Sequence, residues 1–227
     1  MYYFDWTYLL IIPGMLLGLW AQFKVKNTYA EFSRVPTRLG RSAAAVVDDL
    51  LRRNGNNKVR IGHVSGELTD HYNPGNETLN LSDGVYASNS VAALGIAAHE
   101  AGHAMQKHEG YAPLTLRTAI VPAVNICSGL STPLFFLGLL MSWEPLLNLG
   151  IILFAASTVF ALITLPVEFN ASRRAVAMLT AGGYVTGDEE RGVRKVLTAA
   201  ALTYVAAAVT SMLSLLRLVL IANRRRD

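Results

Sequence analysis

Four long apolar stretches divide this chain of 227 residues, and polar or amphipathic sequence fills the intervals between them. The stretches run over residues 6–23, 118–142, 146–165 and 197–221. A helix needs roughly 20 consecutive apolar residues to cross the hydrocarbon core of a bilayer, and each stretch is close to that length or longer. Because only Trp143-Glu144-Pro145 separates the second from the third, we expect those two to form an antiparallel hairpin. The pattern predicts a mainly α membrane protein with about four transmembrane helices.

The first and fourth stretches differ in how clearly they indicate a membrane span. The first has Trp6, Tyr8 and Trp20 near its ends, as an aromatic belt would place them. It lacks the preceding basic residue and the cleavage site of a signal peptide, so we interpret it as a retained anchor. Arg217 interrupts the fourth stretch, and alanines dominate its first half. That segment either spans the membrane or packs its beginning against the polar part of the chain.

The interval from Lys24 to Ala112 has the pattern of a small folded domain. Apolar residues at helical spacing predict a helix over Thr37–Arg53, which Asn54 and Gly55 would end. Short extended segments follow at 58–63, 67–72 and 77–81, separated by residues typical of turns. We therefore expect a small, mostly antiparallel sheet.

The last of these segments and the helix that follows it carry two further predictions. Residues 78–81 are the candidate edge strand for pairing with an extended substrate, although an ordinary edge strand would have the same pattern. The apolar run 91–106 predicts a long helix, capped at its beginning by Ser88 or Asn89.

Composition and charge agree with a membrane protein. Hydrophobic residues make up 52% of the chain and charged residues 16%, and the mean hydropathy is +0.33. The net charge of +4 comes from basic residues beside the apolar stretches, which is an ordinary juxtamembrane pattern, so we expect a lipid bilayer and no nucleic acid as partner. The single cysteine, Cys127, rules out an internal disulfide and a thiolate metal site.

The distribution of basic residues predicts the orientation. Residues 24–117 carry 11 of the 20 Lys and Arg residues and 173–195 carry 5, whereas residues 1–23 and the turn at 143–145 carry none. The positive-inside rule therefore places 24–117 and 173–195 on the cytoplasmic side of the plasma membrane, in a multi-pass protein. A full crossing by the fourth stretch would put Arg224, Arg225 and Arg226 outside, as an exception to this rule.

An H-E-x-x-H sequence, His99 to His103, lies inside the predicted long helix. Helix positions i and i+4 share a face, so both imidazoles can reach one Zn²⁺ ion. Glu100 follows the first histidine and is placed to take a proton from water. The pattern predicts zinc-assisted hydrolysis of a peptide bond.

A catalytic zinc ion of this kind needs a third protein ligand on the same side of the membrane. Two spans after the long helix return the chain to that side, where Glu168 stands at the emerging end of the third apolar stretch. We predict Glu168 as this ligand, with a carboxylate paired to Arg173 or Arg174 as the alternative.

These segments together resemble a known family of enzymes. The HEAGH helix with the downstream Glu-Phe-Asn-Ala-Ser segment is similar to the gluzincin metallopeptidases, in the membrane branch of the CAAX-prenyl endopeptidases and heat-shock membrane proteases. The chain most resembles the bacterial neutral zinc membrane metallopeptidases (YugP-like proteins), and the segments that carry this resemblance are 70–74, 90–93, 99–104, 166–172 and 200–206.

The resemblance implies His99, His103 and Glu168 as zinc ligands and Glu100 as the base. Gluzincins usually have Asp four residues after the ligand Glu, orienting a ligand histidine, whereas this chain has Ser172. Ser172, Asn170 or another acid would then orient the imidazole.

The oxyanion of the reaction also needs a hydrogen-bond donor, and the sequence offers several. The candidates are His71, Tyr72, Arg173 and Tyr204, and we favour His71 and Tyr204 because both lie in segments that match the family. Gly95 and Gly102 interrupt the zinc helix, either as tolerated glycines or because the helix bearing Glu168 approaches closely there.

We therefore expect a membrane-embedded zinc endopeptidase with a zincin-like α+β catalytic part, acting on membrane-associated or misfolded polypeptides. A membrane adaptor or a second copy of the chain would be a further partner. The alternative is a membrane scaffold or adaptor with a structural or inactive zinc site. The expected divisions are an N-terminal anchor over 1–23, the zincin-like part over 24–117, a transmembrane hairpin over 118–165, a helix with the third ligand over 166–196, and a hydrophobic helix with a basic tail over 197–227.

Overall fold

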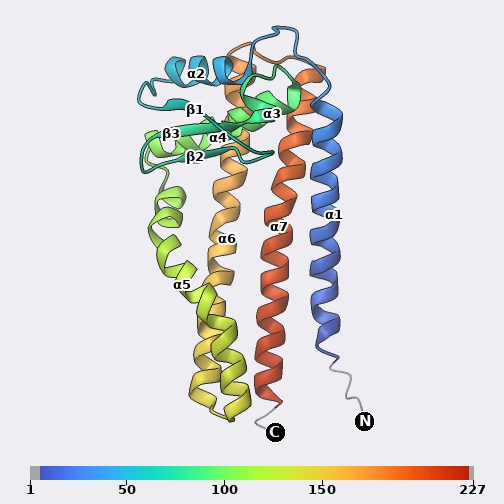
Figure 1. Cartoon of the computed structure of the whole chain (residues 1–227), viewed down its shortest axis with the longest axis vertical. Helices are drawn as coiled ribbons and strands as arrows, with labels where there is room; N and C mark the ends of the chain where they lie inside the picture. Colours follow the sequence, from blue (N-terminus) through green and yellow to red (C-terminus); the bar gives the residue numbers. More distant parts are fainter. Residues whose placement is uncertain (1–5, 225–227) are drawn as a thin grey trace. The chain divides into compact units, whose positions relative to one another are not determined.

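The computed structural model describes residues 6–224 and divides the chain into two compact units (Figure 1). Unit 1 comprises residues 1–22, 116–166 and 202–227, and unit 2 comprises 23–115 and 167–201. Arg225 and Arg226 of the basic tail lie outside the described residues. The elements are α1 (Tyr8–Phe32), α2 (Ala43–Arg53), β1 (Arg60–Val64), β2 (His71–Asn73), β3 (Thr78–Ser82), α3 (Asp83–Tyr86), α4 (Val91–His108), α5 (Ala112–Met141), α6 (Glu144–Ala181) and α7 (Asp188–Asn223).

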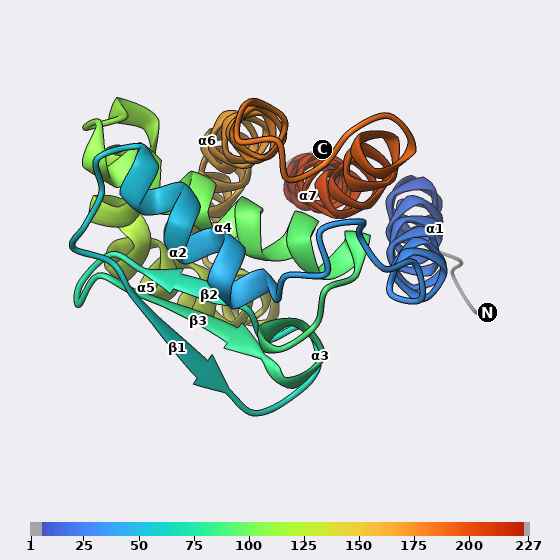
Figure 2. The same cartoon turned by 90° about the horizontal axis from the view of Figure 1, so that it is seen from above.

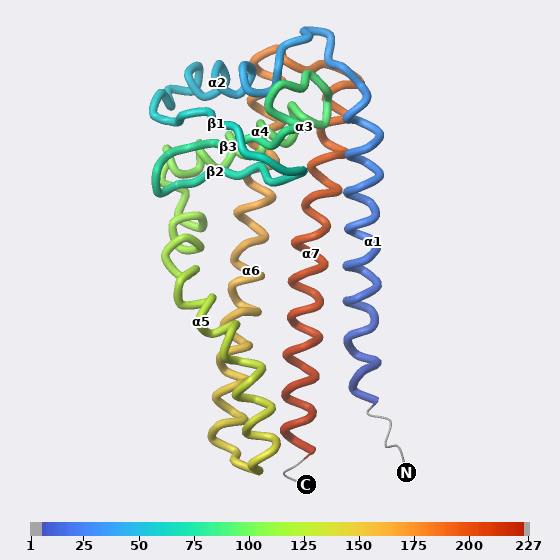
Figure 3. Tube along the Cα trace, in the orientation of Figure 1, coloured from blue at the N-terminus to red at the C-terminus, as the bar shows by residue number. Residues whose placement is uncertain are grey.

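Unit 1 is built from long stretches of α1, α5, α6 and α7, which the Cα trace shows as continuous helices (Figure 3). All four helices are long and apolar enough to cross a membrane, yet only 11 to 22% of the most apolar window of each is buried inside the protein. Because so much apolar surface is left uncovered, a bilayer is the environment that satisfies it. The chain is therefore a mainly helical membrane protein, as the sequence predicts.

Small residues set the helix contacts of unit 1. A Cβ atom added to Gly150 of α6 would lie 2.6 Å from the backbone nitrogen of Phe135 in α5, so these two helices touch backbone to backbone. Ser142 and Trp143 form the turn between them. Gly14 of α1 lies against Thr210 of α7 in the same way. This is the small-residue packing that membrane helices use in place of a hydrophobic driving force.

Unit 2 has a conventional hydrophobic core, to which α2 contributes one face. Val46, Val47, Leu50 and Leu51 are buried at helical spacing. The helix starts at Ala43 and not at Thr37 as predicted, because residues 37–40 form a turn closed by the Gly40 N–H donating to the Thr37 carbonyl oxygen. Gly40 has a φ of +61°, which a helix cannot contain. The Ser42 hydroxyl instead caps α2 by accepting from the Ala45 N–H.

The sheet of unit 2 has the order β1-β3-β2 and is mixed. β2 pairs antiparallel with β3, but β1 pairs parallel with β3, so only one of the two pairings agrees with the mostly antiparallel sheet that was predicted. The loop between β1 and β2 crosses the end of β3, where Asp70 accepts hydrogen bonds from the Ser82 N–H and hydroxyl. The prediction of 78–81 as an edge strand is also wrong, because β3 is central and β2 is an edge.

α4 lies between the sheet and α6 within unit 2, and most of its residues are buried (Figure 2). Its cap is Ser90, whose hydroxyl accepts from the Ala93 N–H, and not Ser88 or Asn89 as predicted. A Cβ on Gly102 would lie 2.5 Å from the carbonyl oxygen of Ala171, so α6 approaches the α4 backbone closely at that glycine. Gly95 faces Val193 of α7 at ordinary contact distance, so the expected close approach by α6 holds for Gly102 only.

Candidate active site

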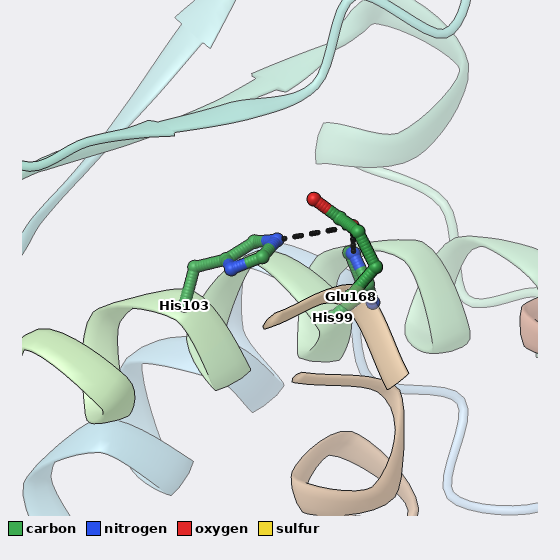
Figure 4. A group of neighbouring side chains, drawn as sticks. All are labelled: His99, His103 and Glu168. Atoms are coloured by element: carbon green, nitrogen blue, oxygen red, sulfur yellow. Dashed lines mark hydrogen bonds and ion pairs between the residues drawn. The ribbon is translucent and has the colours of Figure 1, made fainter. Parts of the chain in front are cut away.

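The two histidines of the H-E-x-x-H sequence lie on consecutive turns of α4 and point the same way. Their ring centroids are 4.7 Å apart and the rings are nearly perpendicular. Glu168, from α6, lies against both: its Oε2 is 3.2 Å from Nε2 of His99 and 3.5 Å from Nε2 of His103 (Figure 4). Glu168 is 69 residues from His99 and 65 residues from His103 along the chain, so side chains distant in sequence meet at one point.

This group of side chains fits a zinc ion. One nitrogen from each histidine and one carboxylate oxygen all lie within 4.8 Å of one another. Two imidazoles and one carboxylate are a donor set of catalytic zinc sites, which leave the fourth position open. Among residues 6–224, no fourth His, Cys, Asp or Glu joins the group. Glu168 is only 2% exposed, and a carboxylate so deeply buried requires cationic or hydrogen-bonding partners.

Each histidine has a further partner for its other ring nitrogen. The Ser172 hydroxyl is 3.2 Å from Nδ1 of His99, so Ser172 takes the place expected for a residue that orients an imidazole. Nδ1 of His103 is instead 3.0 Å from Oε1 of Gln106, a residue that the sequence analysis missed. Its position, three residues after His103 on the same helix face, was the available signal. Asn170 contacts Gln106 and neither imidazole in the contacts described.

The carboxylate of Glu100 faces the sheet. Its Oε2 accepts a hydrogen bond of 2.8 Å from the backbone N–H of Tyr72 in β2. An edge strand and the predicted base are therefore in direct contact. Lys107 of α4 strengthens this arrangement, since its ammonium contacts both the Pro74 carbonyl oxygen and the Glu77 carboxylate at the turn after β2.

The electrostatics of the site favour a cation. Burial lowers the pKa of His103, but the hydrogen bond to Glu168 and the charge of Glu100 outweigh burial and raise this pKa above its ordinary value. The two carboxylates thus stabilise positive charge at the imidazoles. Burial, together with the charge of Glu77, raises the pKa of the nearby Tyr72 to about 12, so its phenol stays protonated.

The remaining residues predicted for the site are placed differently. The side chain of His71 is exposed on β2, where Nδ1 is 2.9 Å from the Thr69 carbonyl oxygen and Nε2 is 3.1 Å from the Asn80 amide nitrogen. Both ring nitrogens of His71 therefore contact neighbouring residues of the sheet region and not the group formed by His99, His103 and Glu168. Arg173 is exposed on α6. Tyr204 lies on α7 within unit 1, and its role stays a prediction.

Known proteins resemble the chain over nearly its whole length. The model of the family described as "Putative neutral zinc metallopeptidase" matches residues 7–223. The chain is 47% identical over 218 residues to the "Putative membrane protease YugP" of Bacillus subtilis (strain 168), an alignment that covers 96% of this chain and 97% of that protein. No solved structure matches the chain significantly.

Proposed function

Because the chain belongs to this family of neutral zinc metallopeptidases, we propose that it is a membrane-anchored zinc endopeptidase of gluzincin type, hydrolysing peptide bonds of membrane-associated or misfolded proteins. The observation that carries the proposal is the convergence of His99, His103 and Glu168 from two helices on one point. In this proposal these three residues hold the zinc ion and Glu100 is the general base.

Zinc supplies Lewis acidity when it is bound, which acidifies water and polarises a carbonyl group. Glu100 takes the proton from the attacking water and later delivers it to the leaving amine. The Tyr72 N–H, which donates to one carboxylate oxygen, leaves the other oxygen of Glu100 to receive that proton. Ser172 holds the imidazole of His99 in a fixed orientation.

The substrate backbone is proposed to lie along β2. The sheet order supports this, since β2 is an edge strand and its Tyr72 N–H points towards Glu100 and away from β3. An extended peptide bound to such an edge would be recognised mainly through its backbone, with little dependence on its side chains. The catalytic site is proposed to act at the cytoplasmic face of the plasma membrane, because the basic residues cluster in 24–117 and 173–195.

The proposal is tested on the full-length protein in detergent, with zinc content and cleavage of unfolded casein measured for each variant. Glu168→Ala should lose zinc and activity together. Glu100→Gln should keep zinc and lose about 10²–10⁴-fold in rate, the usual contribution of general acid–base catalysis. Glu67→Gln removes an exposed carboxylate of the β1–β2 loop and is the control that should change neither quantity.

Two results would contradict the proposal. Cleavage by Glu100→Gln at the parent rate would remove Glu100 from the mechanism. Stoichiometric zinc in a wild-type protein that cleaves no polypeptide would favour the scaffold with a structural zinc site.

A further inference from the structure

We propose that Gln106 is a positioning residue of the zinc site, which fixes the imidazole of His103 and joins it to the part of α6 that carries Glu168. The inference rests on the proposed function, because it gives Gln106 a role towards the same zinc ion. Gln106 is 0% exposed, and each polar atom of its side chain has a partner. Its Oε1 is 3.0 Å from Nδ1 of His103, one turn before it on α4.

The amide nitrogen of Gln106 connects α4 to α6. Nε2 donates to the carbonyl oxygen of Val167 at 2.8 Å and to Oδ1 of Asn170 at 2.9 Å. Val167 immediately precedes Glu168, and Asn170 follows it by two residues. The side chain of Gln106 therefore contacts the backbone just before Glu168, the side chain of Asn170 just after it, and the imidazole of His103.

The partners of Gln106 determine which way its amide group points. Arg174 Nε donates to Oδ1 of Asn170 at 2.7 Å, and a guanidinium can only donate, so this atom of Asn170 must be the oxygen. The Val167 carbonyl is also an acceptor only. Gln106 must then present its NH₂ group to both, which leaves Oε1 facing His103. A second contact fixes the guanidinium of Arg174, which is paired with Glu109 at 2.7 Å.

The direction of this amide sets the tautomer of His103. Because Oε1 of Gln106 accepts, Nδ1 of His103 must carry the proton, and Nε2 of the neutral ring is left with its lone pair. Nε2 is the nitrogen that faces Glu168. The hydroxyl of Ser172 beside His99 can donate or accept, so it orients that ring without fixing its tautomer. Gln106 is therefore the side chain that prepares a histidine of the site to bind a metal ion.

The alternative is that Gln106 is a buried amide that only ties α4 to α6. Asn56 provides the matched control, because it is 5% exposed and its Nδ2 donates to the carbonyl oxygen of Ala104 in the same helix. It touches neither imidazole in the contacts described. Asn56→Leu should reduce stability as loss of a buried hydrogen bond does, and it should leave zinc affinity unchanged.

The experiment measures zinc affinity by chelator competition in full-length protein, together with the visible spectrum of the cobalt-loaded form and thermal unfolding. Gln106→Met keeps the size of the side chain and removes both hydrogen-bonding functions, so zinc affinity should fall about 10–100-fold. The side chain in Gln106→Asn is one methylene shorter and does not reach His103, so the zinc affinity of this variant should fall to a similar degree. Gln106→Glu keeps an acceptor for His103 Nδ1 but loses the donor to the Val167 and Asn170 oxygens. It should therefore recover only part of the affinity lost in Gln106→Met, with a cobalt spectrum closer to that of the parent.

The possible results separate the two roles. Parent zinc affinity in Gln106→Met and Gln106→Asn would overturn the inference, as would a loss in Asn56→Leu equal to that in Gln106→Met. No recovery in Gln106→Glu would also overturn it. If Gln106→Met does not fold, the comparison of Gln106→Asn with Gln106→Glu decides. A wild-type protein that binds no zinc would overturn the proposed function itself, whereas zinc binding that is insensitive to residue 106 overturns only the role of Gln106.

Discussion

Units 1 and 2 use the same kind of segment, an apolar helix, for opposite purposes. In unit 1 the apolar side chains of α1 are largely uncovered, whereas in unit 2 the α4 side chains are mostly enclosed by protein. The polar groups differ accordingly. Unit 2 buries the carboxylate of Glu168 and the amide of Gln106 among hydrogen-bonding partners. The helix contacts of unit 1 use glycines such as Gly14 and Gly150 and a contact between two hydroxyl groups, those of Thr158 and Ser211. Hydrophobicity alone therefore does not tell whether lipid or protein covers a helix.

The largest difference in stability should come from truncating one leucine in each unit. Leu94 of α4 is buried, and Leu94→Ala should cost about 2–5 kcal/mol by leaving a cavity. Leu19 of α1 is exposed, and lipid fills the space that Leu19→Ala leaves, so its cost should stay within about 1 kcal/mol. Unfolding in mixed micelles measures both. Equal costs would mean that α1 is packed against protein.

A charge placed at two similarly exposed leucines, one in each unit, tests which solvent surrounds them. Leu16 of α1 is 61% exposed and Leu39 of unit 2 is 52% exposed. Leu16→Arg should oppose membrane insertion by roughly 2.5–3.5 kcal/mol, whereas Leu39→Arg should change stability by no more than about 0.5 kcal/mol. Insertion is followed by the fraction of protein recovered in membranes. Full recovery of Leu16→Arg would argue against a lipid-facing position.

Two helical glycines should respond in opposite directions to alanine. Gly102→Ala drives a methyl group into the Ala171 carbonyl and should destabilise unit 2 by about 1–3 kcal/mol. Gly18 of α1 has no described atom within 4 Å of an added Cβ, so Gly18→Ala should be neutral or stabilising by up to about 1 kcal/mol. Thermal unfolding of each variant measures the change. A stable Gly102→Ala protein would contradict the close approach of α4 and α6.

The smallest effect is a pH dependence confined to unit 2. Hydrogen bonds from Tyr184 and Arg53, with a further one from Arg41, lower the pKa of Asp49 to about 2. Because the folded pKa lies below the ordinary value of 3.8, this stabilisation is full above about pH 4. It is lost as the pH falls towards about 2.

Unfolding measured between those pH values should show this loss in the wild type and not in Asp49→Asn. Asp48→Asn, which removes a more exposed carboxylate of the same helix, is the control and should keep the wild-type slope. An unchanged slope in Asp49→Asn would remove Asp49 as its source.

The helices were predicted best, because the spacing of apolar residues within one segment is enough to indicate a helix. The apolar face of α2 and the existence of four long helices follow from residue spacing, but the helix ends do not. α1 continues nine residues past the apolar stretch that ends at residue 23, and α6 continues 16 residues past the one that ends at residue 165, because the polar sequence there stays helical. Gly40 turns the chain before α2, and Ser90 caps α4 in competition with Ser88 and Asn89. Several consecutive polar residues can each serve as the cap, and the helix start then shifts by only one or two residues. The spacing of apolar residues therefore does not decide which of them caps α4.

The sheet could not be predicted to the same level. Which strand is central depends on where the loop between β1 and β2 crosses, and the hydrogen bonds of Asp70 with Ser82 fix that crossing. Asp70 and Ser82 belong to different segments, and no periodic pattern in the sequence indicates that they are in contact. For the same reason residues 78–81 are not an edge strand, and the substrate-binding edge that we propose is β2.

The sequence by itself determined the four membrane helices, the shared face of His99 and His103, and the candidate Glu168, because length, periodicity and charge are local properties of the chain. Only the tertiary structure decided that Glu168 reaches both imidazoles, that Tyr72 holds Glu100, and that Gln106 lies behind His103. Those contacts arise from close packing of α4 against α6 and β2. Packing brings together atoms far apart in the chain, so it leaves no repeating signal in the sequence.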